Sequence, residues 1–191
     1  MALSTIKIEG LDKALSRLDV KRYEPQIQMC FDKFGIRVEM KAKQLAPVDE
    51  GHLRGAIFQH PGVLQITVGC AVEYAAYLEF GTRRFAAAYV AALPEQWQVL
   101  AESKRGATGG TFEEMVIRIT AWVKRKGFAA ELTKSGNKSK SVSSIAAQDQ
   151  AAYMIARSIV RKGIKPHPYM YPAVTAETPQ LLADLSKIKI Q

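Results

Sequence analysis

The sequence predicts a fold that combines one long helix, a β-hairpin and several further helices. Apolar residues recur at helical spacing between residues 25 and 45, which is the pattern of a helix that buries one face. Apolar and polar residues alternate between residues 64 and 68, which is the pattern of a half-buried strand. The chain has 191 residues, of which 48% are apolar and 24% charged, so it is long enough for one good-sized core.

The long helix has a predicted beginning and a predicted end. Pro25 suits its first turn, where a backbone N–H has no partner in any case. Pro47 ends it, because proline donates no backbone hydrogen bond and disfavours helix in the residue before it. The apolar positions of its buried face are Ile27, Phe31, Phe34, Val38 and Leu45.

Shorter elements flank this helix. Residues 4–8 alternate and are β-branched, so they predict a short strand that Gly10 ends, and residues 12–18 predict one or two helical turns. Downstream, Asp49 and the two residues after it form a turn with a natural N-cap, and residues 52–57 predict one short helical turn.

A β-hairpin is predicted next. The His-Pro-Gly run at residues 60–62 indicates a turn, with Phe58 before it and the strand of residues 64–68 after it. Residues 72–80 then predict the end of a strand that runs into a short helix, which Gly81 closes.

The second half of the chain reads mainly as helices. Pro94 suits the start of a helix through Leu100, while the pattern around that helix is weak. Thr111 and Glu114 form a T-x-x-E capping box before a helix that Gly127 ends.

The remaining residues predict a loop, two helices and an extended link. Residues 132–144 are small, polar and basic, so they predict a loop, and the helix after them ends at Gly163. Prolines force residues 166–168 into an extended segment. Residues 172–188 predict one helix, with Pro179 near its start or at a kink.

The positive charge is concentrated in one quarter of the chain. The chain carries 27 Lys and Arg against 18 Asp and Glu, and residues 118–165 hold eleven basic and two acidic residues, so this stretch accounts for the whole net charge of +9. Such a block faces nucleic acid or an acidic protein surface, or it is a solubilising face with no partner. The candidate DNA- or partner-facing residues are Arg118, Lys124, Arg125, Lys126, Lys134, Lys138, Lys140, Arg157, Arg161, Lys162 and Lys165.

Composition also points to a compartment. Cys30 and Cys70 lack a CxxC spacing, so we expect two reduced and mostly buried thiols in a cytosolic protein. The apolar runs are too short to span a bilayer, and the first ten residues lack the features of a secretory signal. We therefore expect a soluble intracellular protein with no membrane contact.

The usual signatures of catalysis and metal binding are missing from the sequence. His52, His60 and His167 show no metal-ligand spacing, and the glycine-rich run at residues 106–110 lacks the Lys-Ser/Thr of a phosphate-binding loop. We predict no catalytic, metal-binding or cofactor-binding residues, no cofactor, and a protein that is not an enzyme.

Two carboxylates lie six residues apart in the middle third of the chain, at positions 73 and 79. Glu73 and Glu79 would suit a pair that flanks a substrate cleft, as in glycoside hydrolases. Nothing nearby marks a substrate pocket, and such residues more often face solvent or pair with an arginine such as Arg54.

Known nucleic-acid-binding modules are not evident either. The basic stretch lacks zinc-finger cysteines, an RNA-binding aromatic stripe and a clear helix-turn-helix. Trp122, Phe128 and Tyr153 lie among its basic residues, where they would stack on bases or, as their helical spacing favours, pack in a core. Any DNA contact is therefore expected with the backbone and not with the base sequence.

Three pieces of sequence occur in a distinctive order. They read APVDEGHLRGAI at residues 46–57, VGCAVEYAAYLEFGT at residues 68–82 and PHPYMYPA at residues 166–173. In this order they resemble the phage tail-component family that completes tails at the head–tail neck, whose signature reads APVDTGxLRxSI, VGxxxxYAxYxEFGT and PxPFxxPA. Residues 6–15 also resemble the usual start of that family.

The chain departs from the family pattern in a few places. Glu50 stands for the usual Thr, His52 for Arg and Tyr169 for Phe, and each replacement keeps size or polarity. The larger departure is an insertion of residues 85–162, which holds nearly all of the basic excess.

The resemblance implies an α+β fold, with a small antiparallel β-sheet and a long helix packed on one face, plus a helical insertion. It implies one domain over residues 1–191 in which the three pieces have folding roles. The aromatic residues of the second piece would bury a cluster, and the prolines of the third would stiffen an extended segment along a sheet edge. The structural motif residues are Pro47, Asp49, Gly51, Leu53, Tyr74, Tyr77, Glu79, Gly81, Thr82, Pro166, Pro168 and Pro172.

The resemblance also implies a function. We expect a structural virion protein of the neck that assembles as a homo-oligomeric ring between the head connector and the tail terminator or tail tube. The basic stretch would line a DNA channel or dock on an acidic neighbouring ring. The alternative is a free-standing nucleic-acid-binding protein without sequence specificity that uses residues 118–165.

Overall fold

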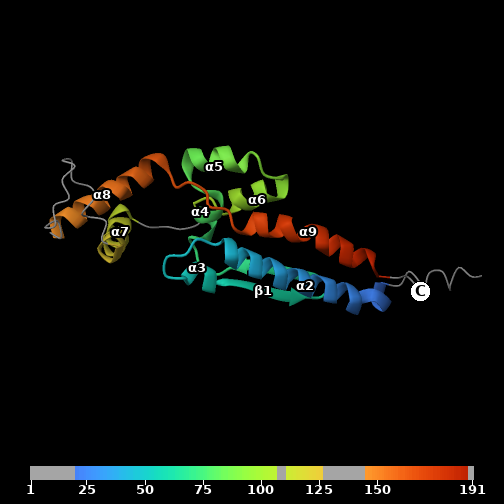
Figure 1. The fold of residues 1–191 in the computed structure, drawn as a ribbon. Helices are drawn as coiled ribbons and strands as arrows, with labels where there is room; N and C mark the ends of the chain where they lie inside the picture. Colours follow the sequence, from blue (N-terminus) through green and yellow to red (C-terminus); the bar gives the residue numbers. More distant parts are fainter. Residues whose placement is uncertain (1–19, 107–110, 127–144, 189–191) are drawn as a thin grey trace, which may run out of the picture. The chain divides into compact units, whose positions relative to one another are not determined.

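The computed structural model describes residues 20–106, 111–126 and 145–188. These residues form eight helices and one two-stranded antiparallel sheet, which confirms the α+β fold class. The chain divides into two compact units: residues 1–72 with 168–191, and residues 73–167, which contain the whole predicted insertion (Figure 1). The predicted elements at residues 4–18 and 132–144 lie outside the described residues.

The first unit is built on the long helix α2 (Val20–Leu45). It ends two residues before Pro47, as predicted, because the proline removes the next helical donor. The predicted first-turn position of Pro25 is wrong, since the helix begins five residues earlier and runs through this proline. A proline so near the start interrupts few helical hydrogen bonds, so the helix continues.

The turn after α2 leads into the short helix α3 (His52–Gly55). Its N-cap residue is Gly51, with φ 83°, and the cap makes no side-chain hydrogen bond. The prediction that Asp49 occupies the N-cap is therefore wrong, and the turn depends on a left-handed conformation that glycine adopts without strain. Leu53, in the middle of α3, is buried.

The predicted hairpin is present, but its turn lies elsewhere. Strand β1 (Ile57–Gly62) pairs with β2 (Gln65–Cys70) in a register that places Ile57 opposite Cys70 and Pro61 opposite Ile66. The His-Pro-Gly run therefore belongs to β1, and the turn is formed by residues 63 and 64, with φ 51° at Leu64. Pro61 is tolerated because both strands of a two-stranded sheet are edge strands.

Helix α2 packs against one face of this hairpin, as predicted (Figure 1). The helix lies close to the sheet at the buried Gly35, where an added Cβ would lie 2.5 Å from Cγ1 of Ile66. Val38 and Ala42, one and two turns further on, are fully buried. A glycine at position 35 thus sets how near the helix and the sheet can come.

Helix α9 (Met170–Ser186) also packs on α2. Arg37 of α2 forms ion pairs with Glu177 at 3.1 Å and with Asp184 at 3.4 Å. The pKa of Asp184 lies below its ordinary value of 3.8, chiefly because Gln180 donates a hydrogen bond to it and also because of Lys187 and Arg37.

The third sequence piece differs from its predicted conformation. The link between α8 and α9 is non-helical, as predicted, but Pro172 lies in the first turn of α9, where a proline is compatible with helix. The link makes its backbone hydrogen bonds with Leu78 and Thr82 near the end of a helix, and not with a strand edge. Pro179 lies inside α9, which continues through it.

The second unit begins with three short helices, α4 (Ala75–Phe80), α5 (Arg83–Val90) and α6 (Glu95–Ser103). The sequence predicted α4 and α6 but not α5. The expected aromatic cluster is smaller than predicted, because Tyr74 is 43% exposed and Phe80 alone is buried, with its ring centroid 6.3 Å from that of Trp97. Glu79 is only 4% exposed and Glu73 is exposed, so the solvent-facing alternative is confirmed for Glu73 and wrong for Glu79.

Helices α7 (Phe112–Lys126) and α8 (Ile145–Lys162) complete the second unit. The capping box is confirmed: Glu114 N–H donates to Oγ1 of Thr111 at 3.2 Å, and Thr111 N–H donates to Oε2 of Glu114 at 3.1 Å. Val123 of α7 packs against Ala151 and Ala152 of α8.

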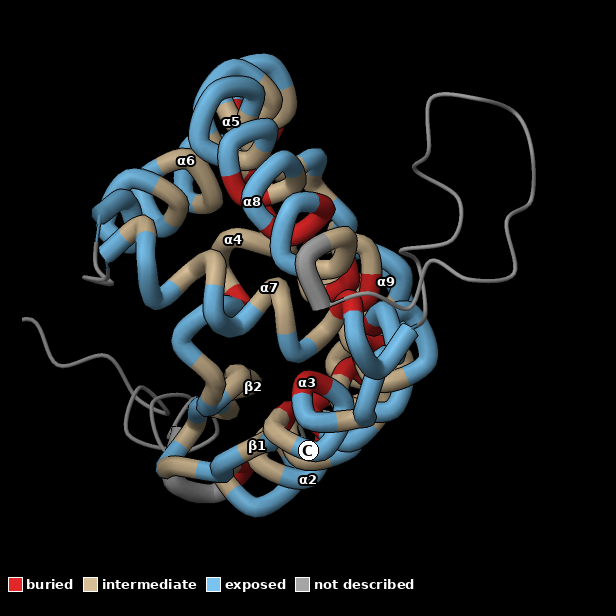
Figure 2. The backbone as a smooth tube through the Cα atoms, turned by 90° about the vertical axis from the view of Figure 1, so that its left-hand side faces the viewer, coloured by how far each residue is buried: buried red, intermediate tan, exposed pale blue. Residues whose placement is uncertain are grey.

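The aromatic residues of the basic stretch have different surroundings. Trp122 packs against the α7–α8 core, as its spacing favours, while Tyr153 is 47% exposed and meets Phe112 edge to face. Phe128 lies outside the described residues. Figure 2 shows that buried positions occur in short stretches of the tube and that exposed positions predominate between them.

Substitution of Gly35 tests the helix–sheet contact. We expect Gly35→Val to lower the free energy of unfolding by about 1–3 kcal/mol, because its side chain has to displace Ile66. The matched control is Gly55→Val, since a Cβ at Gly55 meets nothing within 4 Å. Urea unfolding followed by circular dichroism measures both, and equal losses would show that Gly35 is not a point of close approach.

Candidate interaction surface

The end of α4 and the end of α8 meet in the second unit at a backbone junction. Thr82 N–H donates to the carbonyl oxygen of Ile164 at 2.9 Å, and Ile164 N–H donates to Oγ1 of Thr82 at 2.7 Å. His167 N–H donates to the carbonyl oxygen of Leu78 at 2.7 Å. Residues 78–82 of the second sequence piece are thus bonded to Ile164, just before the third piece, and to His167 within it.

Two glycines make this junction possible. Gly81 has φ 73° and Gly163 has φ 90°, conformations that other residues adopt only with strain. A Cβ at Gly81 would lie 2.8 Å from the carbonyl oxygen of Ile164, and a Cβ at Gly163 would collide with the carbonyl oxygen of Thr82. Both positions therefore require the absence of a side chain as well as a positive φ.

The junction gathers positive charge from two distant parts of the sequence. Two arginines follow Thr82 directly, and basic residues stand on either side of Gly163. All five side chains are exposed, and within the described part of the chain none of them forms an ion pair. These junction cations are Arg83, Arg84, Arg161, Lys162 and Lys165.

An aromatic ring helps to position two of the junction cations. The Arg84 guanidinium carbon lies 4.8 Å from the centre of the Phe85 ring, and Lys165 Nζ lies 5.9 Å from it. Cation–π contacts of this kind attract both side chains to one ring. Arg83, Arg84 and Phe85 were not predicted from the sequence, although two consecutive arginines directly after the second piece were a visible signal.

A second basic group lies at the end of α7. Lys124, Arg125 and Lys126 occupy its last turn, all three are exposed, and they stabilise the negative end of the helix dipole. Arg118 and Arg157, further along α7 and α8, are exposed as well. Lys134, Lys138 and Lys140 lie outside the described residues.

The predicted basic surface is therefore divided between two places on the helices. Val123 packs near Ala152, so the end of α7 lies beside the middle of α8. Lys162 is ten residues further along α8, which corresponds to about 15 Å of helix. Arg161, Lys162 and Lys165 thus lie near the arginines at the start of α5 and form one basic group with them. The basic residues at the end of α7 form a second, separate group.

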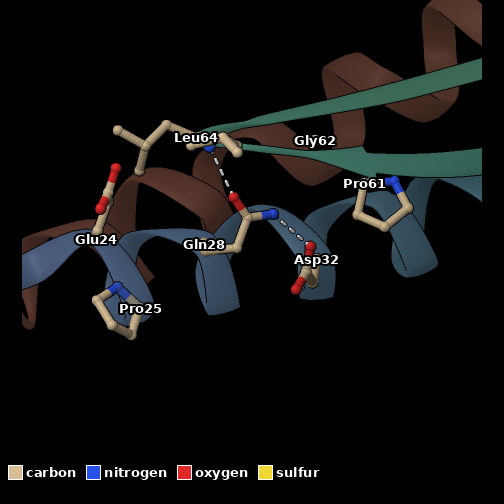
Figure 3. Close-up of a pocket in the computed structure, with 8 residues that line it drawn as sticks. Glu24, Pro25, Gln28, Asp32, Pro61, Gly62 and Leu64 are labelled. Atoms are coloured by element: carbon tan, nitrogen blue, oxygen red, sulfur yellow. Dashed lines mark hydrogen bonds between the residues drawn. The ribbon is translucent and has the colours of Figure 1, made fainter.

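The first unit contains an open pocket between α2 and the tip of the hairpin (Figure 3). Its volume is about 530 Å³, and its lining includes the carboxylates of Glu24 and Asp32. Gln28 connects the two walls, because its side-chain oxygen accepts from Leu64 N–H at 2.8 Å while its nitrogen donates to Asp32 at 2.8 Å. These bonds hold the hairpin tip on the helix.

The histidines and cysteines do not converge on a reactive centre in the described residues. His52 lies 3.5 Å from Glu50, and His167 Nδ1 lies 3.1 Å from the backbone oxygen of Lys165. Both cysteines are free, with Cys30 buried and Cys70 half-buried, as the sequence predicted. Within the described ranges, no three His, Cys, Asp or Glu residues are grouped as a metal ion would require.

None of the helices that the structure describes is long and apolar enough to cross a bilayer. Comparison with known protein families, with curated proteins and with solved structures found no match.

Substitution of Gly163 tests the junction. We expect Gly163→Ala to cost about 1–2 kcal/mol for the left-handed backbone, and about 1–3 kcal/mol more for the collision with Thr82. The matched control is Gly106→Ala, because Gly106 has φ 70° and a Cβ there meets nothing within 4 Å.

Urea unfolding gives the two losses, and hydrogen exchange at the Thr82 and Ile164 amides shows where the second unit loosens. The junction would be refuted as a structural requirement if both variants lost the same stability and kept the same protection at these amides.

Proposed function

We propose that this chain is a structural protein of the phage head–tail neck, which completes the tail or joins it to the head. In this proposal it assembles as a homo-oligomeric ring between the head connector and the tail terminator or tail tube. It acts in the virion after assembly in the host cytoplasm, and it needs complementary surfaces and symmetric repetition instead of catalysis.

One observation carries the proposal. The second and third sequence pieces, which resemble the neck family, are hydrogen-bonded to each other at Leu78–His167, and Thr82 of the second piece is bonded to Ile164, two residues before the third. Pieces that characterise one family in a fixed order are expected to have a common structural role. The long helix on an antiparallel hairpin, with the first piece directly after the helix, also matches the fold that the resemblance implies.

The surface of α2 supports self-association. Met29, Ile36 and Met40 are 54%, 49% and 58% exposed, and their spacing places them along one side of the helix. Exposed apolar side chains that share a face favour a protein contact over solvent. A ring provides such a contact for every copy.

The exposed basic residues support a role beside an acidic partner. A channel that carries DNA needs attraction to the phosphate backbone without base reading, which lysines and arginines provide. An acidic face of a neighbouring ring would use the same charges.

The alternative is a nucleic-acid-binding protein that works outside a particle. The same exposed residues favour it, since neutralisation of phosphates needs no other feature. It predicts steeply salt-dependent binding of duplex DNA by a monomer, whereas the neck proposal predicts charge-dependent function within a ring.

A charge-removal experiment tests the proposal. The variant combines Lys124→Ala, Arg125→Ala, Lys126→Ala, Arg161→Ala and Lys162→Ala, all at exposed positions. The control exchanges Lys for Arg and Arg for Lys at the same five positions, which keeps the charge. We expect the alanine variant to lose docking to neighbouring neck proteins or retention of DNA in filled heads, and the control to keep both.

Binding to duplex DNA over a salt series is measured in parallel. The slope of log K against log salt is negative, and each lost phosphate contact makes it shallower by about 0.9. Full docking and full DNA retention by the alanine variant would contradict a role for these charges in the neck.

A further inference from the structure

The second unit contains a cavity that is separate from the α7 cations. It lies among α4, α5 and α6 and has a volume of about 190 Å³. Its apolar wall includes the buried Phe80 and the small side chain of Ala101. A cavity of this kind has room for a small ligand or for one group of a larger one.

Three cationic residues line this cavity: Arg83 from the start of α5, and Lys104 and Arg105 from the end of α6. None of the described residues that line it is acidic. Arg105 pairs with Glu102 at 2.8 Å, whereas Arg83 and Lys104 form no ion pair with a described residue. Thr82 also lines the cavity, and because its oxygen accepts from Ile164 N–H, its own proton remains available for donation.

We propose that this cavity binds the phosphate group of an organic phosphate. Charged donors that converge from two helices suit an oxyanion, and charge-assisted hydrogen bonds are stronger than neutral ones. The wall at Phe80 suits an apolar or planar part attached to the phosphate. The site is independent of ring formation, so its failure and the failure of the neck proposal are distinguishable.

The test uses deoxyadenosine monophosphate as the probe and deoxyadenosine as its phosphate-free counterpart. Trp97 reports binding through its emission, since it contacts Phe80, and Trp122→Phe in every sample removes the other tryptophan signal. We expect saturable binding of the monophosphate and none of the nucleoside at the same concentration.

Two variants probe the charge and the space separately. Lys104→Gln with Arg105→Gln is expected to weaken binding by about tenfold or more, while the control pair Lys33→Gln with Arg54→Gln, at exposed positions of the first unit, stays within about twofold. Ala101→Leu keeps every charge but fills the cavity, so it is also expected to abolish binding. Circular dichroism confirms that each variant is folded.

Competition by a 5′-phosphorylated single strand identifies the source of the phosphate. Displacement of the monophosphate by the strand assigns the cavity to nucleic acid, and binding without displacement assigns it to a free nucleotide; both outcomes support the proposal. No saturable binding by the parent protein, equal binding of the nucleoside, equal loss in the control pair or full binding by folded Ala101→Leu would overturn it.

Discussion

The arrangement of the second unit depends on two hydrogen bonds, one between backbone groups and one to the Thr82 hydroxyl, that join residues 82 positions apart. Thr82 and Ile164 each donate to the other, and helices α5 to α8 lie between them in the chain. Closing so long a loop costs conformational entropy, which is why a lasting contact needs good geometry. Gly81 and Gly163 supply it by allowing positive φ and close backbone approach. The same contact between Thr82 and Ile164 brings the junction cations together, so the positive charge of this surface depends on the backbone conformation.

Helix α2 organises the first unit, as the Thr82–Ile164 contact organises the second. One side meets the hairpin at Gly35, Arg37 pairs with α9, and a third side leaves Met29, Ile36 and Met40 exposed. Both units thus contain a packed interior and an exposed surface of distinct character, apolar on α2 and cationic at the junction. A ring protein that contacts its copies and a charged neighbour needs surfaces of these two kinds, and a monomeric DNA-binding protein needs only the second.

Local signals in the sequence were sufficient for several elements. Pro47 marks the end of α2, and the Thr111–Glu114 capping box marks the start of α7, because each acts within one helical turn. The hairpin was predicted with its turn misplaced, since the His-Pro-Gly run looks like a turn while the real turn at Val63 and Leu64 lacks typical turn residues. Helix α5 was missed because it has only eight residues and follows α4 after two residues, so the stretch is too short for a periodic pattern to stand out.

The candidate surface was less predictable, for a different reason. The sequence indicated which residues are basic, but the meeting of Arg83 and Arg84 with Lys165 depends on a long-range backbone contact. The burial of Glu79 was missed for a similar reason, since carboxylates are rarely buried and no local pattern marks the exception. Local patterns therefore predict elements, while the grouping of charges needs the fold.

The mass of the purified chain in solution tests the proposed assembly into a closed ring. Light scattering over a concentration series at two salt concentrations gives this mass for the purified protein. We expect one discrete species of several copies, or a monomer that closes into such a species as the concentration rises. A monomer at every concentration and at both salt concentrations would contradict self-assembly and favour the DNA-binding alternative.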